Sequence, residues 1–110
     1  MSPSDKPLVW LSGVLTTPPI SGDTRVQAGY LLRLLQGGAS LSLPGSRPMP
    51  AIGKRCHELR LNDEDCIWRI FYRIDRDAIV IPHWTVKKTA KTSKTDIELC
   101  KGRLHDYDAA

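Results

Sequence analysis

The sequence predicts a single α+β domain with the element order β-α-loop-β-β-β-α. An apolar repeat of three and four residues runs through 23–36, which is typical of a helix with one buried face. Three runs rich in β-branched and aromatic residues, at 57–61, 66–74 and 78–86, are separated by short polar turns. A second helical repeat follows them, and a chain of 110 residues is large enough for one hydrophobic core.

The first half of the chain is expected to contain one strand, one helix and a loop. Residues 8–11 are short and apolar enough for an opening strand, and Thr17 is a candidate helix N-cap ahead of Pro18. Glycine tolerates the conformation that ends a helix, so Gly37 and Gly38 mark the helix end. The buried stripe of this helix would consist of Ala28, Leu31, Leu32 and Leu35.

The second half is expected to form an antiparallel meander followed by a helix. Residues 39–55 are rich in Pro, Gly and Ser and predict a loop with room for a short helical turn. The polar connectors 62–65 and 75–77 are short enough to join antiparallel strands. The last helix would begin after Thr92 or Ser93 and end near 107. Its docking residues would be Ile97, Cys100, Leu104 and Tyr107.

Positive charge is concentrated in one segment of the chain. Residues 83–103 carry six Lys or Arg against two Asp or Glu, whereas the rest carries ten of each, so the whole net charge of +4 lies there. Such a segment favours a polyanionic partner, with nucleic acid as the first candidate. A solvated lysine surface without any partner is the alternative.

Composition also bounds the location and the cofactors. No apolar run approaches the roughly 20 residues of a membrane span, and the first residues lack the pattern of a signal peptide, so a cytoplasmic protein is expected. Three cysteines at wide spacing favour thiols over a disulfide framework. Cys56, His57 and Cys66 lack the paired spacing of a zinc site, so neither a metal nor another cofactor is expected.

Strand alternation predicts where the arginines of 66–74 lie. A core face would carry Cys66, Trp68, Ile70, Tyr72 and Ile74, and the other face Ile67, Arg69, Phe71 and Arg73. On the next run the same rule groups Ile79, Ile81, His83, Thr85 and Lys87. One hypothesis therefore places four basic residues in an open, shallow groove: Arg69, Arg73, His83 and Lys87. Arg60 and Glu58 would extend the groove, and Pro82 implies a sheet edge or a bulge.

The lysines after the last strand have a matching rationale. Repulsion among Lys87, Lys88, Lys91 and Lys94 is relieved when phosphates bind and counterions leave. An arginine on a rigid strand can stabilise a pentacoordinate phosphate, and a lysine with a lowered pKa can transfer a proton. These groups favour cleavage of RNA with its own 2′-hydroxyl as nucleophile.

Simpler interpretations stay open at this point. Arg69 and Arg73 can form ion pairs with Asp75, Asp77 or Glu58 instead of binding phosphate. An aromatic residue between two arginines is more often part of a core than a platform for stacking bases.

Three stretches carry a family resemblance: RVQAGYLLRLLQGGASLSLPGSRPMPAIGKRCHELRL, WRIFYRIDRDAIVI and VKKTAKTSKTDIELCKGRLHDYD. They resemble the phage-derived branch of the RelE/ParE toxin superfamily, near the HigB-type toxins, from about residue 9 to residue 108. The resemblance implies one RelE-like domain over 1–110, with flexible ends at about 1–7 and 108–110. It implies a small antiparallel sheet with two N-terminal helices and one C-terminal helix, in the order β-α-α-β-β-β-α.

The resemblance also implies roles for individual residues. Arg69 matches the central-strand arginine that contacts the scissile phosphate, and Lys87 and Lys88 match basic positions after the last strand. Arg60 and Lys91 match basic family positions with less fixed roles. Arg73, Lys94 and His83 complete the expected RNA-binding set. Ser93 stands where the family usually has a proline, and the tyrosine of some RelE relatives has no clear counterpart.

The implied function is that of a toxin in a type II toxin–antitoxin system, which cleaves mRNA on the ribosome and arrests translation. Its expected partner is a helix-turn-helix, HigA-like antitoxin, with no membrane and no small-molecule cofactor involved. One alternative is a non-enzymatic, ParE-like inhibitor of DNA gyrase, because the superfamily holds such members and a fold does not settle the target. Another is a degenerate phage-derived module that binds only nucleic acid or its partner.

Overall fold

The computed structural model describes residues 5–15, 20–64, 66–87 and 91–110 of the chain. Within these residues the chain forms five strands and two helices, which confirms the α+β class. In chain order the elements are β1 (Leu8–Trp10), α1 (Gly22–Gln36), β2 (Ser46–Pro48), β3 (Cys56–Asp63), β4 (Cys66–Ile74), β5 (Ile79–Lys87) and α2 (Lys94–Ala109).

The expected second N-terminal helix is wrong for this chain. Residues 39–55 form loops and turns around the three-residue strand β2, which pairs antiparallel with β3. Pro44, Pro48 and Pro50 lack the amide hydrogens that helical bonding requires. Pro48 is tolerated in β2 because this strand lies at the edge of the sheet, where one side needs no donor.

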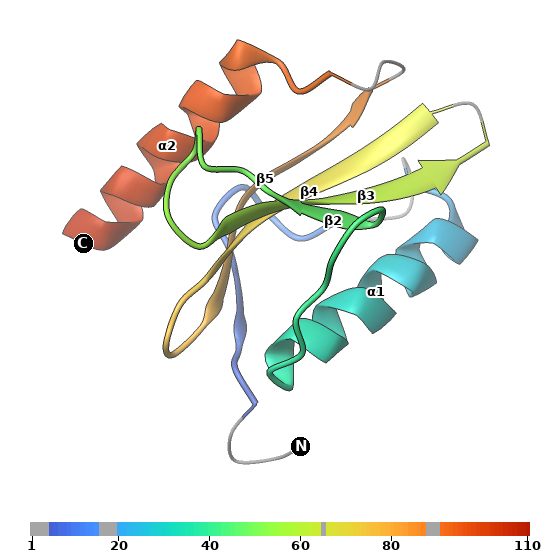
Figure 1. The fold of residues 1–110 in the computed structure, drawn as a ribbon, viewed down its shortest axis with the longest axis horizontal. Coiled ribbons are helices and arrows are strands. Elements are labelled where there is room, and N and C mark those ends of the chain that lie inside the picture. The colour runs from blue at the N-terminus through green and yellow to red at the C-terminus, as the bar shows by residue number, and fades with distance from the viewer. Residues whose placement is uncertain (1–4, 16–19, 65, 88–90) are drawn as a thin grey trace.

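The five strands form one mixed sheet in the order β1-β5-β4-β3-β2 (Figure 1). The predicted antiparallel meander of β3, β4 and β5 is confirmed. The expectation of a wholly antiparallel sheet is wrong at β1, which pairs parallel with β5. The long connection through α1, β2, β3 and β4 permits this, because parallel neighbours need a crossover rather than a tight turn.

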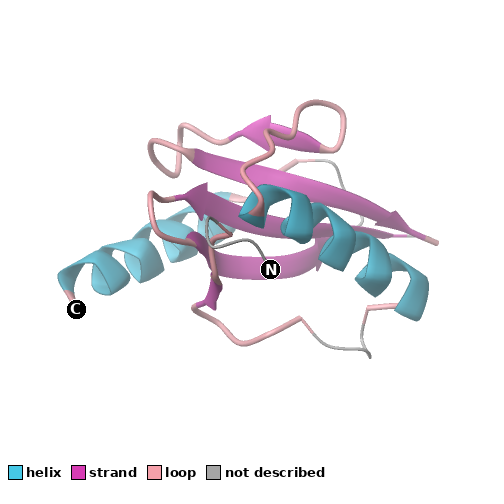
Figure 2. Ribbon diagram, turned by 90° about the horizontal axis from the view of Figure 1, so that it is seen from below, coloured by secondary structure: helices cyan, strands magenta, loops and turns pink. Residues whose placement is uncertain are grey.

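The two helices cover opposite faces of the sheet, so the domain has three layers (Figure 2). On one face α1 packs its stripe of Ala28, Leu32 and Leu35 against Trp68, Ile70 and Tyr72 of β4, among others. On the other face α2 packs Cys100 and Leu104 against Phe71 of β4 and Val80 of β5. The alternation predicted for β4 is therefore confirmed. Its second face is covered by a helix rather than open.

A bulge in β5 reverses part of the predicted face assignment. Phe71 pairs with His83 while Arg73 pairs with Val80, so β5 holds one extra residue there, beside Pro82. The bulge that Pro82 predicted is thus present. Because the extra residue changes the alternation, Ile79 and Ile81 lie in the core under α1, whereas His83 stacks on Phe71 on the α2 side. Placing these isoleucines on one face with His83 was wrong.

Serine residues cap both helices, because a serine hydroxyl can accept a bond from a free first-turn amide. The side chain of Ser21 accepts from the amide of Thr24, so α1 begins later than the proposed N-cap at Thr17, which lies outside the described residues. Ser93 is the N-cap of α2, as one of the two expected candidates, and accepts from the amide of Asp96. After α1, Gly38 adopts the left-handed conformation at φ 94°, which favours glycine.

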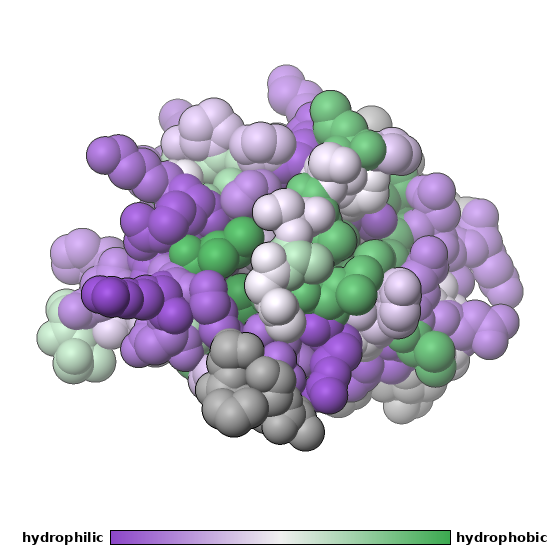
Figure 3. Space-filling model, turned by 60° about the horizontal axis from the view of Figure 1, so that its bottom comes forward, coloured by the Kyte–Doolittle hydropathy of each residue, from purple (hydrophilic) through white to green (hydrophobic). Residues whose placement is uncertain are grey.

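The described parts of both chain ends make defined contacts. The amide of Lys6 bonds to the carbonyl of Gln36, and the carbonyl of Pro7 accepts from Ile79. Asp108 pairs with Arg73. On the face shown in Figure 3, hydrophilic side chains occupy most of the periphery and apolar ones gather near the middle. Among the described residues, neither helix combines the length and apolar character that a membrane span requires.

Candidate functional site

Three arginines from three neighbouring strands converge on one buried carboxylate. Glu58 of β3 is fully buried, with Arg47 of β2 3.4 Å away and Arg69 of β4 also 3.4 Å away. Arg60 donates from Nε to the same carboxylate. Strand register explains the arrangement, because Arg47 pairs with Glu58 and Arg60 pairs with Arg69 across the sheet. A carboxylate tolerates such burial only when it is paired.

Thr92 links this arginine cluster (Arg47, Arg60 and Arg69 around Glu58) to the segment before α2. Its hydroxyl donates to Oε2 of Glu58 at 2.6 Å and accepts from Nη1 of Arg69 at 3.0 Å. Nη2 of Arg47 lies 3.3 Å from the same hydroxyl. A hydroxyl can do both, whereas carboxylates only accept and guanidiniums only donate. The lysine-rich segment is thereby tied to the sheet beside the arginines.

Arg69 does not lie in the open groove that its strand position predicted. Its side chain is fully buried and is held by Glu58 and Thr92. Burial lowers the pKa of Arg69 and the carboxylate of Glu58 opposes this, but a guanidinium stays charged at neutral pH. The alternative of an ion pair with Glu58 is confirmed.

Arg73 also forms ion pairs and lies away from the arginine cluster. It donates to both oxygens of Asp75, at 2.7 and 2.8 Å, and to both oxygens of Asp108, at 2.9 and 2.7 Å. These bonds hold the pKa of Asp108 below its usual value and raise that of Arg73. Because Asp108 belongs to α2, Arg73 fastens the end of this helix to β4.

We expect Asp108→Asn to lower the free energy of unfolding by about 1 kcal/mol or less at pH 7, because the Asp108 side chain is 54% exposed and such pairs are screened. A carboxylate whose pKa is lowered by folding stabilises above its unfolded pKa, and this contribution is lost as the pH falls through the folded value. The difference from wild type should therefore shrink below about pH 4. Urea titrations at several pH values would measure it.

Asp106→Asn provides the matched control, because the Asp106 side chain is 88% exposed near the same helix end. A difference for Asp108→Asn that persisted unchanged below pH 3 would contradict the ion-pair explanation.

His83 joins α2 to the sheet. Its ring stacks on Phe71 at 5.9 Å, Nε2 lies 3.3 Å from Oδ1 of Asp96, and Nη1 of Arg103 lies 3.2 Å from Nδ1. Because a guanidinium can only donate, Nδ1 accepts and the ring proton is carried by Nε2, which donates to Asp96. The contacts of His83 thus serve helix docking.

The remaining predicted residues lie around the arginine cluster in different ways. Lys91 is exposed and directly precedes Thr92, and Lys94 is exposed at the first position of α2. Lys87 ends β5 at the position paired with Ile67, and Lys88 lies outside the described residues. The structure therefore brings Arg60, Arg69 and the segment of Lys91 together. Arg73 bonds instead to Asp75 and Asp108, and His83 lies across Phe71 from Glu58, in contact with Asp96 and Arg103.

Sequence reasoning missed Arg47 and the linking role of Thr92. Arg47 belongs to a three-residue strand inside a segment rich in proline and glycine, so no alternation revealed it. The available signal was Pro48, because proline is compatible with an edge strand and residues 46–48 could therefore have been considered as one.

In comparisons with known proteins, neither a curated protein nor a solved structure matches the chain. The family described as "Phage derived protein Gp49-like (DUF891)" matches residues 20–105. The matched stretch includes α1, the whole arginine cluster and most of α2. Because it covers most of the chain, the protein belongs to this phage-derived Gp49-like family, which is associated with toxin–antitoxin systems.

Proposed function

We propose that the protein is the toxin of a type II toxin–antitoxin system, of the RelE/HigB kind, and that it cleaves mRNA on the ribosome. The observation that carries the proposal is the arginine cluster beside the lysine-rich segment. Three guanidiniums against one carboxylate leave an excess of positive charge there, and exposed Lys91 and Lys94 add to it. A phosphodiester is the ligand that such an arrangement favours.

In this proposal Arg47 and Arg60 contact the phosphate. Their side chains are 38% and 22% exposed, so each can keep its bond to Glu58 while another part of the guanidinium faces solvent. Glu58 holds both groups in place before the substrate arrives, which is the condition for electrostatic stabilisation without reorganisation. Arg69, whose side chain is fully buried, acts as a positioning residue through Glu58 and Thr92.

The proposed reaction is an internal transfer. The 2′-oxygen of the ribose forms a bond to phosphorus, and the bond from phosphorus to the 5′-oxygen of the next nucleotide breaks. A base removes the proton from the 2′-hydroxyl, and an acid gives a proton to the leaving oxygen. We assign these two proton transfers to Lys87 and Lys88, with the guanidiniums stabilising the charge on the phosphate oxygens.

Inducible expression with mapping of mRNA 5′ ends tests the function. Wild type should arrest growth and produce new 5′ ends within coding regions, whereas Lys87→Ala/Lys88→Ala should remove both effects. Arg33→Ala is a suitable control, because it removes charge from an exposed position of α1, on the other face of the sheet. Arg69→Ala is a weaker test, because it also disturbs a buried ion pair.

Other outcomes of this experiment have distinct meanings. Growth arrest accompanied by DNA damage, with the mRNA left uncleaved, would indicate a gyrase inhibitor. If expression of wild type did not arrest growth, the protein would be a degenerate module. The proposed antitoxin is a helix-turn-helix protein encoded beside the toxin, with an acidic segment that covers the lysines. Its co-expression should relieve the arrest, and a failure to do so would count against this partner.

A further inference from the structure

A pocket lined by several basic residues, here called the basic pocket, lies against the C-terminal half of α2, away from the arginine cluster. It has a volume of about 490 Å³ and lies between the loop that precedes β3 and the last turns of the helix. Its charged lining residues are Lys54, Arg55, Arg73, Lys101 and Asp108.

The charges around this pocket are mostly positive. Arg73 donates to the carboxylates of Asp108 and Asp75, and Arg55 also pairs with Asp75, so these two arginines and two carboxylates largely neutralise one another. Lys54 and Lys101 then supply the remaining formal charge. The ion pair of Lys101 with Glu98 is long, at 3.7 Å, and both side chains are about half exposed, so it offers little competition to an anion.

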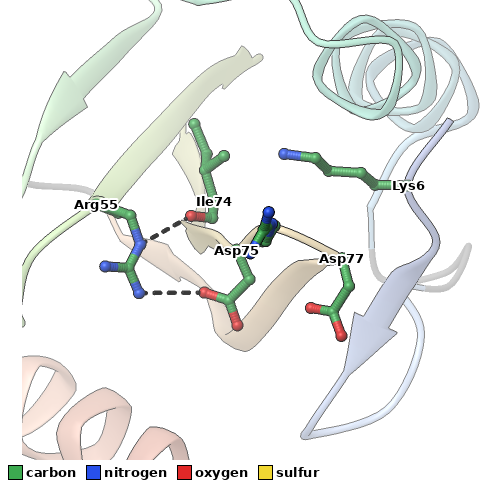
Figure 4. Close-up of a pocket in the computed structure, with 6 residues that line it drawn as sticks. Lys6, Arg55, Ile74, Asp75 and Asp77 are labelled. Carbon is green, nitrogen blue, oxygen red and sulfur yellow. Dashed lines mark hydrogen bonds and ion pairs between the residues drawn. The ribbon is translucent and has the colours of Figure 1, made fainter. Parts of the chain in front are cut away.

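Arg55 provides an independent indication that this region is used. Its backbone adopts φ 63°, in the left-handed region that strongly favours glycine, so an arginine here carries a conformational cost. Its Nε donates to the carbonyl of Ile74 at 3.0 Å, and Nη2 lies 3.6 Å from Asp75 (Figure 4). These contacts hold the side chain, which is 60% exposed, between the basic pocket and the neighbouring pocket of Figure 4.

The basic pocket and the arginine cluster lie along one seam, which is the line of contact between α2 and the segment that joins β2 to β3. On this side of the sheet the segment between β2 and β3 runs beside α2 (Figure 1), and Met49 and Ile52 share a hydrophobic cluster with Cys100 and Leu104. Basic residues occur on both sides of the seam. Lys94, near the arginine cluster, and Lys101, in the basic pocket, are separated by about 10 Å of helix rise.

We propose that the basic pocket binds a second phosphate of a single-stranded RNA whose scissile phosphate lies at the arginine cluster. This inference rests on the proposed function. Positive charges spaced along both sides of one seam suit a ligand with a negative charge in every unit, and polyanion binding by such charges is driven by counterion release. The basic pocket would therefore lengthen the RNA contact without taking part in cleavage.

RNA length provides the test. Binding of a fluorescein-labelled oligouridylate of about ten nucleotides would be compared with binding of a labelled uridine dinucleotide. For Lys54→Ala/Lys101→Ala we expect about a 10-fold loss of affinity for the long RNA, because both lysine contacts to the second phosphate are removed. Affinity for the dinucleotide, which is too short to span the seam, should stay the same. Equal affinity of variant and wild type for the long RNA would overturn the proposal.

Two controls separate this proposal from the proposed function. Arg33→Ala/Arg76→Ala removes the same charge from exposed positions outside the lining of the basic pocket and outside the arginine cluster, and it should leave the affinity for the long RNA within about 2-fold of wild type. If Arg47→Ala/Arg60→Ala weakens binding of the long RNA and Lys54→Ala/Lys101→Ala does not, only the basic-pocket proposal fails. If wild type binds neither RNA, the basic-pocket proposal fails, whereas the proposed function fails only if wild type produces no new mRNA 5′ ends in cells. Displacement of the long RNA by oligoglutamate at equal charge concentration would indicate a peptide site and overturn the proposal.

Discussion

Glu58→Gln should lower the free energy of unfolding by about 3–5 kcal/mol, because it removes one partner of a buried ion pair. The change keeps the shape of the side chain but removes the charge that faces Arg47, Arg60 and Arg69. Arg69 is fully buried, so water cannot replace the lost carboxylate. The three guanidiniums would also repel one another without a negative charge between them.

Urea unfolding of wild type and variant measures this effect. Glu98→Gln is the matched control, because its carboxylate is 58% exposed and forms only a surface pair with Lys101 in the described contacts. That control should change stability by about 0.5 kcal/mol or less. If Glu58→Gln proved as mild as the control, the buried carboxylate would not be what holds the arginines together.

The double variant Glu58→Gln/Arg69→Met extends the argument. Replacing both members of a buried pair is commonly far less costly than removing one. Here the double variant leaves no fully buried charge without a partner, since Arg47 and Arg60 are partly exposed to solvent. The double variant should therefore be more stable than Glu58→Gln alone. This comparison separates the energy of the pair from the effect of an altered shape.

The sequence was sufficient to predict most of the fold. Alternation along β4 placed Trp68, Ile70 and Tyr72 in one core correctly, and the spacing of Cys100 and Leu104 docked α2. In both elements the buried face can be identified from the sequence, because apolar residues recur with the two-residue period of a strand or the 3.6-residue period of a helix. The register of β5 could not be predicted in the same way, because a bulge shifts every later side chain to the other face.

The candidate site was only partly predictable, for a different reason. Alternation placed Arg69 and Phe71 together on one face, but it does not tell whether that face is open or covered. The answer depends on where α2 docks and on the bond from Thr92 to Glu58, a contact between residues 34 positions apart. Arg47 belongs to β2, a three-residue strand that is too short to show an alternation of apolar and polar residues in the sequence. Long-range partners of this kind are set by the tertiary structure.

Arg47→Ala/Arg60→Ala should weaken binding of single-stranded RNA about 50-fold at about 50 mM salt, because both guanidinium contacts to the scissile phosphate and the associated counterion release are lost. Glu58 keeps Arg69 and Thr92 as partners, so the domain should still unfold cooperatively. The loss of binding would then reflect the missing contacts. A folded variant of this kind separates recognition from stability, which Glu58→Gln cannot do.

The salt dependence gives a sharper measurement than affinity alone. For single strands the slope of log affinity against log salt is about −0.7 per neutralised phosphate. Arg47 and Arg60 share one phosphate in this proposal, so removing both should reduce the magnitude of the slope by about 0.7. Arg33→Ala/Arg76→Ala, which removes equal charge from other exposed positions, should leave the slope near that of wild type. If both double variants changed the slope equally, binding would depend on net charge alone. In that case the arginine cluster would contribute to RNA binding only through its charge. If the guanidiniums around Glu58 hold a phosphate specifically, removing them must change the slope more than removing equal charge elsewhere on the surface.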